Sequence, residues 1–222
     1  KFDGIHPSRT QEINPVGRKI NLRYEFEFSN FNPKDTLIKG SIVSLYEKIR
    51  FHRLELGWRE SIKLPAWKHT LSAHLRGGTI FGPPVDNFFN FYIGGLAGMK
   101  GYSFYSLGGN EFAMANITYR FPLLENIDLR FLQMQFNSLY ASVYGDAGSV
   151  WTGGGLKNRK WKKDAGVELR IEAFSYYAFP TRIFFNATYG FDKFNYTMEQ
   201  TSKSTSTVVT YGKEWNFHFG VL

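Results

Sequence analysis

The feature that most constrains the fold of this chain is an alternation of large apolar and polar side chains with a period of two. In residues 18–29, one face carries the large apolar groups of Ile20, Leu22, Tyr24, Phe26 and Phe28. The opposite face carries Asn21, Arg23, Glu25, Glu27 and Ser29. A period of two indicates a β-strand. Charged groups opposite such a wide apolar face are typical of a strand between lipid and a polar lumen.

The same period recurs along the chain, whereas helical periodicity is hard to find. It predicts eight strands at residues 18–29, 43–60, 68–82, 109–121, 129–150, 164–174, 182–191 and 211–222. In the last segment, Asn216, His218 and Gly220 alternate with the apolar residues Trp215, Phe217, Phe219 and Val221. The sequence therefore predicts an all-β protein built from antiparallel strands.

The connections between these strands alternate in length. Residues 61–67, 122–128 and 175–181 are short connections, and each lies between two longer ones. Transmembrane barrels show this parity because their periplasmic turns are short and their extracellular loops are long. The short connections are therefore expected at the periplasmic side, where the last strand would also end.

Composition agrees with a membrane barrel. Aromatic residues make up 18% of the 222 residues, yet the mean hydropathy is only −0.31. No uncharged apolar run reaches the roughly 18 residues that a transmembrane helix needs. There are no cysteines, which excludes disulfides and thiolate metal sites. The net charge of +8 favours anionic partners, either lipid and lipopolysaccharide or nucleic acid.

The connection at residues 83–108 is the longest and contains Gly94, Gly95, Gly98 and Gly101. We expect it to be an extracellular loop that folds into the lumen. Because side chains just fill the interior of an eight-strand barrel, a loop inside requires a wider one. Residues 1–222 are therefore interpreted as the C-terminal part of a barrel domain of about 16 strands. The start at Lys1 suggests a processed or truncated chain, and the phase of the last strand predicts at least one further aromatic residue beyond Leu222.

Four ordered motifs carry a resemblance to a known family. They are Met99-Lys100-Gly101-Tyr102, Gly108-Gly109-Asn110, Tyr119-Arg120-Phe121-Pro122 and Asp146-Ala147-Gly148-Ser149-Val150-Trp151. In this order and at these spacings, they resemble the BamA/TamA (bacterial surface antigen) superfamily of outer-membrane assembly and translocation barrels. The family pattern also has five strands after the loop, as predicted here.

The resemblance implies that the loop tip is held in the lumen by Met99, Lys100, Gly101 and Tyr102, with Lys100 paired to Asp146. Two positions depart from the family pattern. Lys100 stands where the family has arginine, which loses the bidentate fork, and Thr118 stands where many relatives have glutamate. The alternative is a solvated Asp146 without a fixed partner.

A second candidate site is the basic run in residues 157–163, on a predicted extracellular loop. Its charged members are Lys157, Arg159, Lys160, Lys162 and Lys163. They would contact lipopolysaccharide phosphates by charge attraction, unless the run is an ordinary solvated loop. No recognition helix or aromatic platform accompanies it, so nucleic acid is not expected as a partner. No catalytic, metal-binding or cofactor motif is present.

The resemblance implies a protein that assembles, inserts or translocates polypeptides, or lipids, without catalysing a covalent reaction. We expect it in the outer membrane of a Gram-negative-type bacterium rather than that of an organelle. Its expected partners are lipid, lipopolysaccharide, unfolded outer-membrane or secreted polypeptides, and the rest of its own barrel. The exposed edge of the last strand would pair with an incoming strand. The alternatives are a passive pore, or a membrane anchor for an N-terminal domain such as POTRA repeats, a patatin-like lipase or a β-propeller.

Overall fold

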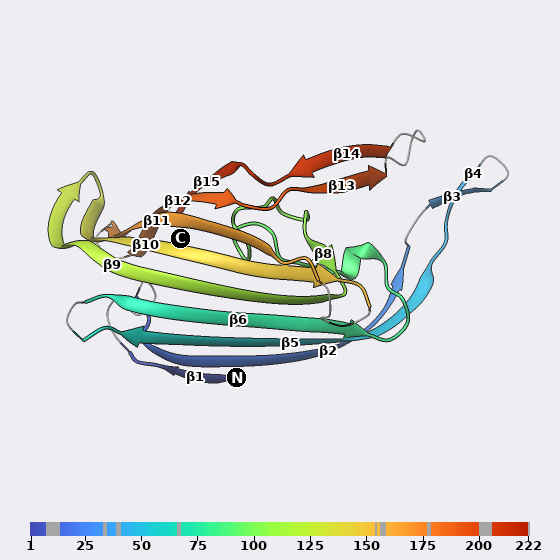
Figure 1. Ribbon diagram of the computed structural model, residues 1–222, viewed down its shortest axis with the longest axis horizontal. Helices are drawn as coiled ribbons and strands as arrows, with labels where there is room; N and C mark the ends of the chain where they lie inside the picture. Colours follow the sequence, from blue (N-terminus) through green and yellow to red (C-terminus); the bar gives the residue numbers. More distant parts are fainter. Residues whose placement is uncertain are drawn as a thin grey trace.

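The computed structural model describes residues 1–7, 14–32, 35–38, 41–65, 68–153, 155, 159–176, 179–199 and 206–221. Within these residues the chain is all-β apart from the short 3₁₀ helix η1 (Asn87–Phe89). Nine strands form one antiparallel sheet in the order β1-β2-β5-β6-β9-β10-β11-β12-β15 (Figure 1). The described part contains no helix long and apolar enough to cross a membrane.

The strands of this main sheet are β1 (Phe2–Ile5), β2 (Gly17–Phe31), β5 (Glu47–Lys63), β6 (Thr70–Phe81), β9 (Glu111–Phe131), β10 (Met134–Trp151), β11 (Lys162–Ser175), β12 (Phe179–Gly190) and β15 (Trp215–Val221). Three two-stranded ribbons accompany it. They are β3 (Asp35–Ile38) with β4 (Ser41–Ser44), β7 (Phe91–Tyr92) with β8 (Gly108–Gly109), and β13 (Phe194–Glu199) with β14 (Ser206–Tyr211).

Each of the eight predicted strands corresponds to a strand of the main sheet, with shifts at several ends, so the predicted all-β antiparallel fold is confirmed. Five of them follow the long loop, as expected. From β2 to β12 these strands are 12 to 21 residues long, which exceeds the 9–11 residues or so that a tilted strand needs to cross a bilayer. The short strand β1, which pairs with the start of β2, was not predicted.

The predicted turn at residues 122–128 is wrong. These residues continue β9, and the hairpin to β10 turns further on, with Leu132 at a φ of 54°. Asn126 and Asp128 also have positive φ, and the register between β9 and β10 shifts twice in this region. Asparagine and aspartate tolerate the left-handed conformation, and here they lie at irregularities within the strand. Because the same residue types are common in turns, the segment was mistaken for a turn.

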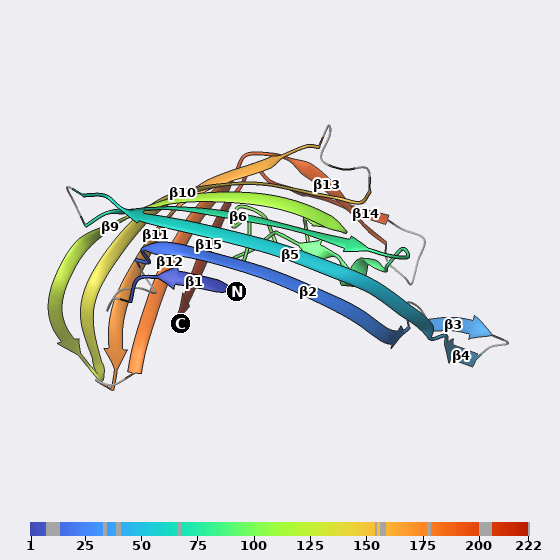
Figure 2. The same ribbon diagram turned by 90° about the horizontal axis from the view of Figure 1, so that it is seen from below.

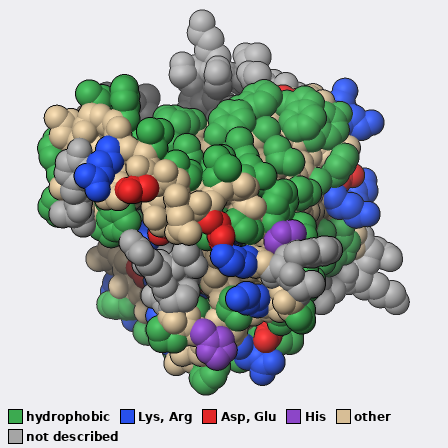
Figure 3. All heavy atoms as spheres, turned by 90° about the vertical axis from the view of Figure 1, so that its left-hand side faces the viewer, with side chains coloured by type: hydrophobic (Ala, Val, Ile, Leu, Met, Phe, Trp, Pro, Cys, Tyr) green, Lys and Arg blue, Asp and Glu red, His purple; other side chains and the backbone are tan. Residues whose placement is uncertain are grey.

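The two faces of the main sheet differ in chemistry. Across the strands, Val143 lies beside Val167, which lies beside Ala187 and then Phe217. The exposed apolar side chains of this face include Leu22, Tyr24, Phe26, Leu56, Ile117, Leu169, Phe185 and Phe219. The other face carries Asp146, Asp164, Glu168 and Arg170. Figure 3 shows hydrophobic side chains gathered mainly on the upper side of the molecule in that view, with charged and histidine side chains mostly below and at the edges.

The polar face is concave and contacts the loop between β6 and β9, at residues 82–107. Figure 2 shows the arched sheet with this loop within the arch. Loop residues Phe91, Ile93, Met99, Tyr102 and Leu107 form a buried core with Phe51, Ile80, Phe112 and Met114 of the sheet. The sheet is not closed within the described residues, because β1 and β15 are its two ends and do not pair with each other.

Candidate functional site

The loop between β6 and β9 is a compact unit. Its two ends are joined by β7 and β8, where Phe91 pairs with Gly109 and Tyr92 with Gly108. At its start, Asp86 caps η1 by accepting a hydrogen bond from the Phe88 N–H (2.8 Å). Further in, the Met99 N–H donates to the Ile93 carbonyl (2.6 Å), and the Gly95 N–H donates to the Tyr102 carbonyl (2.8 Å). Hydrogen bonds within the loop therefore help to define the shape of its backbone.

Two glycines allow this shape. Gly95 has a φ of +80°, a conformation that other residues rarely adopt. At Gly101, an added Cβ would lie 2.6 Å from the Cβ of Asp164 and 3.0 Å from the Cα of Gly190. Glycine at position 101 therefore lets the loop backbone approach the sheet directly.

Residues 99–102, the loop tip, are fixed to the sheet mainly through the backbone. The Gly101 N–H donates to Asp164 Oδ2 (2.8 Å), and the Gly101 carbonyl accepts from Asn216 Nδ2 (3.0 Å). These two partners belong to β11 and β15. Met99 is fully buried, and its sulfur lies against Gly148 of β10. The tip thus links the loop to three strands that follow it in the sequence.

Tyr102 adds a side-chain anchor. Its hydroxyl donates to the Lys163 carbonyl (2.7 Å) and accepts from the Asp192 N–H (3.1 Å). Only 1% of its surface is exposed. Burial raises the pKa of Tyr102 to about 12, so the phenol stays neutral and remains a hydrogen-bond donor at any physiological pH.

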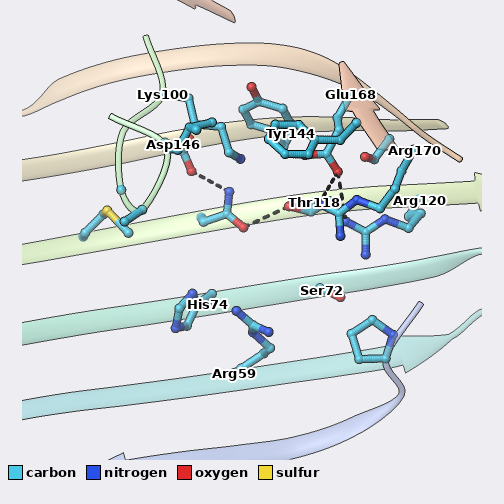
Figure 4. A pocket seen from close by; sticks show the side chains of 18 residues that line it. Arg59, Ser72, His74, Lys100, Thr118, Arg120, Tyr144, Asp146, Glu168 and Arg170 are labelled. Atoms are coloured by element: carbon cyan, nitrogen blue, oxygen red, sulfur yellow. Dashed lines mark hydrogen bonds and ion pairs between the residues drawn. The ribbon is translucent and has the colours of Figure 1, made fainter. Parts of the chain in front are cut away.

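The predicted ion pair between Lys100 and Asp146 is wrong. No carboxylate of the described residues lies within 4.0 Å of the Lys100 ammonium. Its Nζ instead lies 3.8 Å from the centroid of the Tyr144 ring (Figure 4). The ring face attracts a cation, and Tyr144 is positioned by a hydrogen bond from its hydroxyl to Asn186 Oδ1 (2.7 Å). Lysine can occupy this place because a ring face does not require the planar fork of arginine.

Asp146 is buried and has a different partner. Asn116 Nδ2 donates to Asp146 Oδ1, and the Thr118 hydroxyl donates to Asn116 Oδ1 (2.9 Å; Figure 4). Thr118 thus supports Asp146 through Asn116. Asp146 also faces Asp164 directly in the register of β10 and β11. The acid that contacts the loop is therefore Asp164, which sequence reasoning missed although it lies on the polar phase of its strand.

A second charged group on the concave face also escaped sequence reasoning. Glu168 of β11 is buried and contacts two guanidiniums, that of Arg170 at 2.8 Å and that of Arg120 at 3.7 Å (Figure 4). All three lie on the polar phase of their strands, which is the signal that marks them. Glu168 thus links Arg170 of its own strand to Arg120 of β9.

Two members of the basic run in residues 157–163 contact other parts of the protein. Lys157 lies outside the described residues. Arg159 donates to the Gly155 carbonyl (2.7 Å), and Lys162 lies 5.0 Å from the centroid of the Phe194 ring. Lys160 and Lys163 are exposed. Two of the five predicted lipopolysaccharide contacts are therefore engaged within the protein, and two face solvent.

The predicted edge strand lies at the end of the sheet. β15 pairs with β12 on one side, and the order of the described strands puts nothing on its other side. Its apolar residues Trp215, Phe217, Phe219 and Val221 are all exposed, Phe219 at 71%.

The described residues contain no cluster of three or more His, Cys, Asp or Glu side chains that would hold a metal ion. A scan against protein-family models, a search of curated proteins and a search of solved structures each gave no match for this chain.

Proposed function

We propose that this chain is part of an outer-membrane β-barrel that inserts or translocates polypeptides, or lipids, at the outer membrane of a Gram-negative-type bacterium. The observation that carries the proposal is the division of one curved sheet into an apolar convex face and a charged concave face with a loop packed against it. A soluble protein would bury such an apolar face against a second layer. In a bilayer, lipid covers it.

The charged side chains on the convex phase support a membrane position. Arg18 pairs with Glu60 (2.6 Å) near one end of β2 and β5, and Arg50 lies over the Phe28 ring (4.8 Å) toward the other end. Between them the convex side of β2 carries Ile20, Leu22, Tyr24 and Phe26. An apolar band with charges at its rims is the arrangement that a bilayer requires.

The open edges support the insertion role. Unpaired backbone groups are costly in lipid, so the free edge of β15 needs a partner, either another part of the barrel or an incoming strand. A strand of a client protein could pair there by β-augmentation. The loop packed on the concave face argues against the alternative of a wide passive pore, since it occupies part of the space behind the wall.

The test is an insertion assay with the full-length protein in liposomes. A urea-unfolded small barrel protein is added, and its folding rate is followed by gel mobility. The protein is expected to accelerate folding compared with empty liposomes. Because the chain has no native cysteines, His218→Cys on β15 can be used to crosslink a client that carries a cysteine in its terminal strand.

The matched control is Leu169→Cys in the middle of the sheet. Crosslinks at residue 218 but not at residue 169 support strand pairing at β15. No acceleration of folding and equal crosslinking at both positions would contradict the insertion role and leave the membrane-anchor alternative.

A further inference from the structure

The concave side of β5 and β6 carries a group of basic side chains that lie close together. Lys19 of β2 faces Arg59 of β5, and Arg59 faces His74 of β6 in the sheet register. Arg76 lies two residues further along β6. Arg59 interacts electrostatically with both His74 and Arg76. Figure 4 shows Arg59 and His74 on neighbouring strands, on the same side of the sheet.

The nearby carboxylates are already used by other cations. Asp3 lies 3.2 Å from Lys19 and 3.7 Å from Lys1, and Glu55 lies 3.0 Å from Arg53. Within the described residues, neither Arg59 nor Arg76 has a carboxylate within 4.0 Å. Arg76 instead donates to the Ala97 carbonyl of the loop (3.0 Å). The two guanidiniums of like charge therefore repel each other, and no carboxylate of the described residues lies within 4.0 Å of either one.

Space for a ligand lies next to these groups. One hollow of about 660 Å³ is lined by Lys19, Arg23, Arg59 and Arg76, among others. A second hollow of about 550 Å³ lies on the Asp146 side of the loop. Arg59, His74 and Ala97 line both. The two hollows therefore adjoin each other at the basic group.

We propose that the concave face of β5 and β6 binds a phosphate group between Arg59 and Arg76. A guanidinium presents a planar pair of N–H donors that matches two phosphate oxygens. One phosphate would remove the repulsion between the two arginines and accept hydrogen bonds from both. This site is independent of the proposed insertion role, because it requires only the concave face and the loop. The phosphate could be free or carried by a lipid headgroup.

The experiment is a calorimetric titration of the full-length protein in zwitterionic detergent, which measures the binding affinity of each probe. One arm uses inorganic phosphate, and the other uses short-chain phosphatidic acid, which carries the same group on a lipid. Arg59→Gln with Arg76→Gln is expected to weaken binding roughly tenfold or more, since two charge-assisted contacts are lost. Arg50→Gln is the matched control. It lies on the same strand as Arg59 but on the opposite phase, and should bind like the wild type.

A second variant keeps the test decisive if the glutamine variant does not fold. Arg59→Lys with Arg76→Lys keeps both charges and loses the forks, so it is expected to retain weakened binding. Arginine-dependent binding in either arm supports the site, and binding of the lipid alone identifies the headgroup as the source. The proposal is overturned if neither probe binds the wild type, or if Arg50→Gln weakens binding as much as the double variant.

Discussion

The two sides of the concave face differ in how their polar groups are satisfied. On the side of β10, β11 and β15, the loop tip is buried and its hydrogen bonds end on Asp164, Asn216 and the Lys163 carbonyl. At the basic group of β5 and β6, Arg59 and Arg76 face a hollow, and Arg76 donates to the Ala97 carbonyl of the loop. The loop tip is therefore fixed by hydrogen bonds to β11 and β15, whereas the loop borders a hollow beside Arg59 and Arg76. The fixed side depends on backbone contacts more than on an ion pair.

The contrast is tested most strongly at Gly101. Gly101→Val would place a Cβ 2.6 Å from the Cβ of Asp164. The loop tip would therefore have to move away from β11. We expect a loss of about 3 kcal/mol or more in the local stability of the loop. Hydrogen exchange of the amides in residues 94–103 measures it. Gly57→Ala is the control, because nothing lies within 4 Å of its added Cβ.

Asp164 should matter more to the loop than Asp146. Asp164→Ala removes the acceptor of the Gly101 N–H and leaves this buried donor unsatisfied, which costs about 2 kcal/mol. Asp146→Ala removes a partner of Asn116 instead. Protease cleavage near Gly101 is therefore expected to rise more in the Asp164 variant. Greater cleavage in the Asp146 variant would restore the original hypothesis that Asp146 holds the loop.

Tyr102→Phe removes a hydroxyl that satisfies two backbone groups, at Lys163 and Asp192. The expected loss is about 1 kcal/mol, or roughly fivefold faster exchange of the loop amides. Tyr105→Phe is the matched control, since that side chain is mostly exposed. Equal effects in the two variants would show that the phenol of Tyr102 does not anchor the tip.

Lys100→Ala should have the smallest effect. It removes a cation–π contact with Tyr144, worth about 0.5–1 kcal/mol, and leaves the backbone contacts of the tip in place. Exchanging the charges of Lys100 and Asp146 should give no mutual rescue, because the two side chains do not form a pair. Rescue in the double variant, measured as restored protease resistance, would contradict this geometry.

Most of the fold could be predicted from the sequence, because each strand of a two-faced sheet has its own alternation of apolar and polar side chains. Segments 18–29 and 164–174 could be assigned from their residues alone. The segment at 122–128 could not, because Asn126 and Asp128 have the same composition in a strand irregularity as in a turn. The short strand β1 lacks a sufficient run of alternation to be recognised.

The sequence indicated which loop forms the site, but it did not indicate which residues the loop tip contacts. The glycines of the loop could be read from the sequence, and the resemblance implied a tip that is held against the barrel wall. Whether Asp146 or Asp164 contacts the loop depends on how far the loop tip extends across the concave face of the sheet. The pattern of apolar and polar side chains does not specify this distance. The pairing of Lys100 with the Tyr144 ring depends likewise on a three-dimensional approach between distant segments.

In the proposed membrane position, the convex face contacts lipid, and the concave face contacts water and the loop. The absence of native cysteines permits single-cysteine variants to be labelled in liposomes. Leu169→Cys lies on the convex face, and Ser72→Cys lines the hollow at the concave face. A fluorescent label at residue 169 should be quenched by brominated lipid and protected from an aqueous quencher, and a label at residue 72 should behave in the opposite way. Aqueous quenching at residue 169 together with lipid quenching at residue 72 would show that the convex face does not contact lipid.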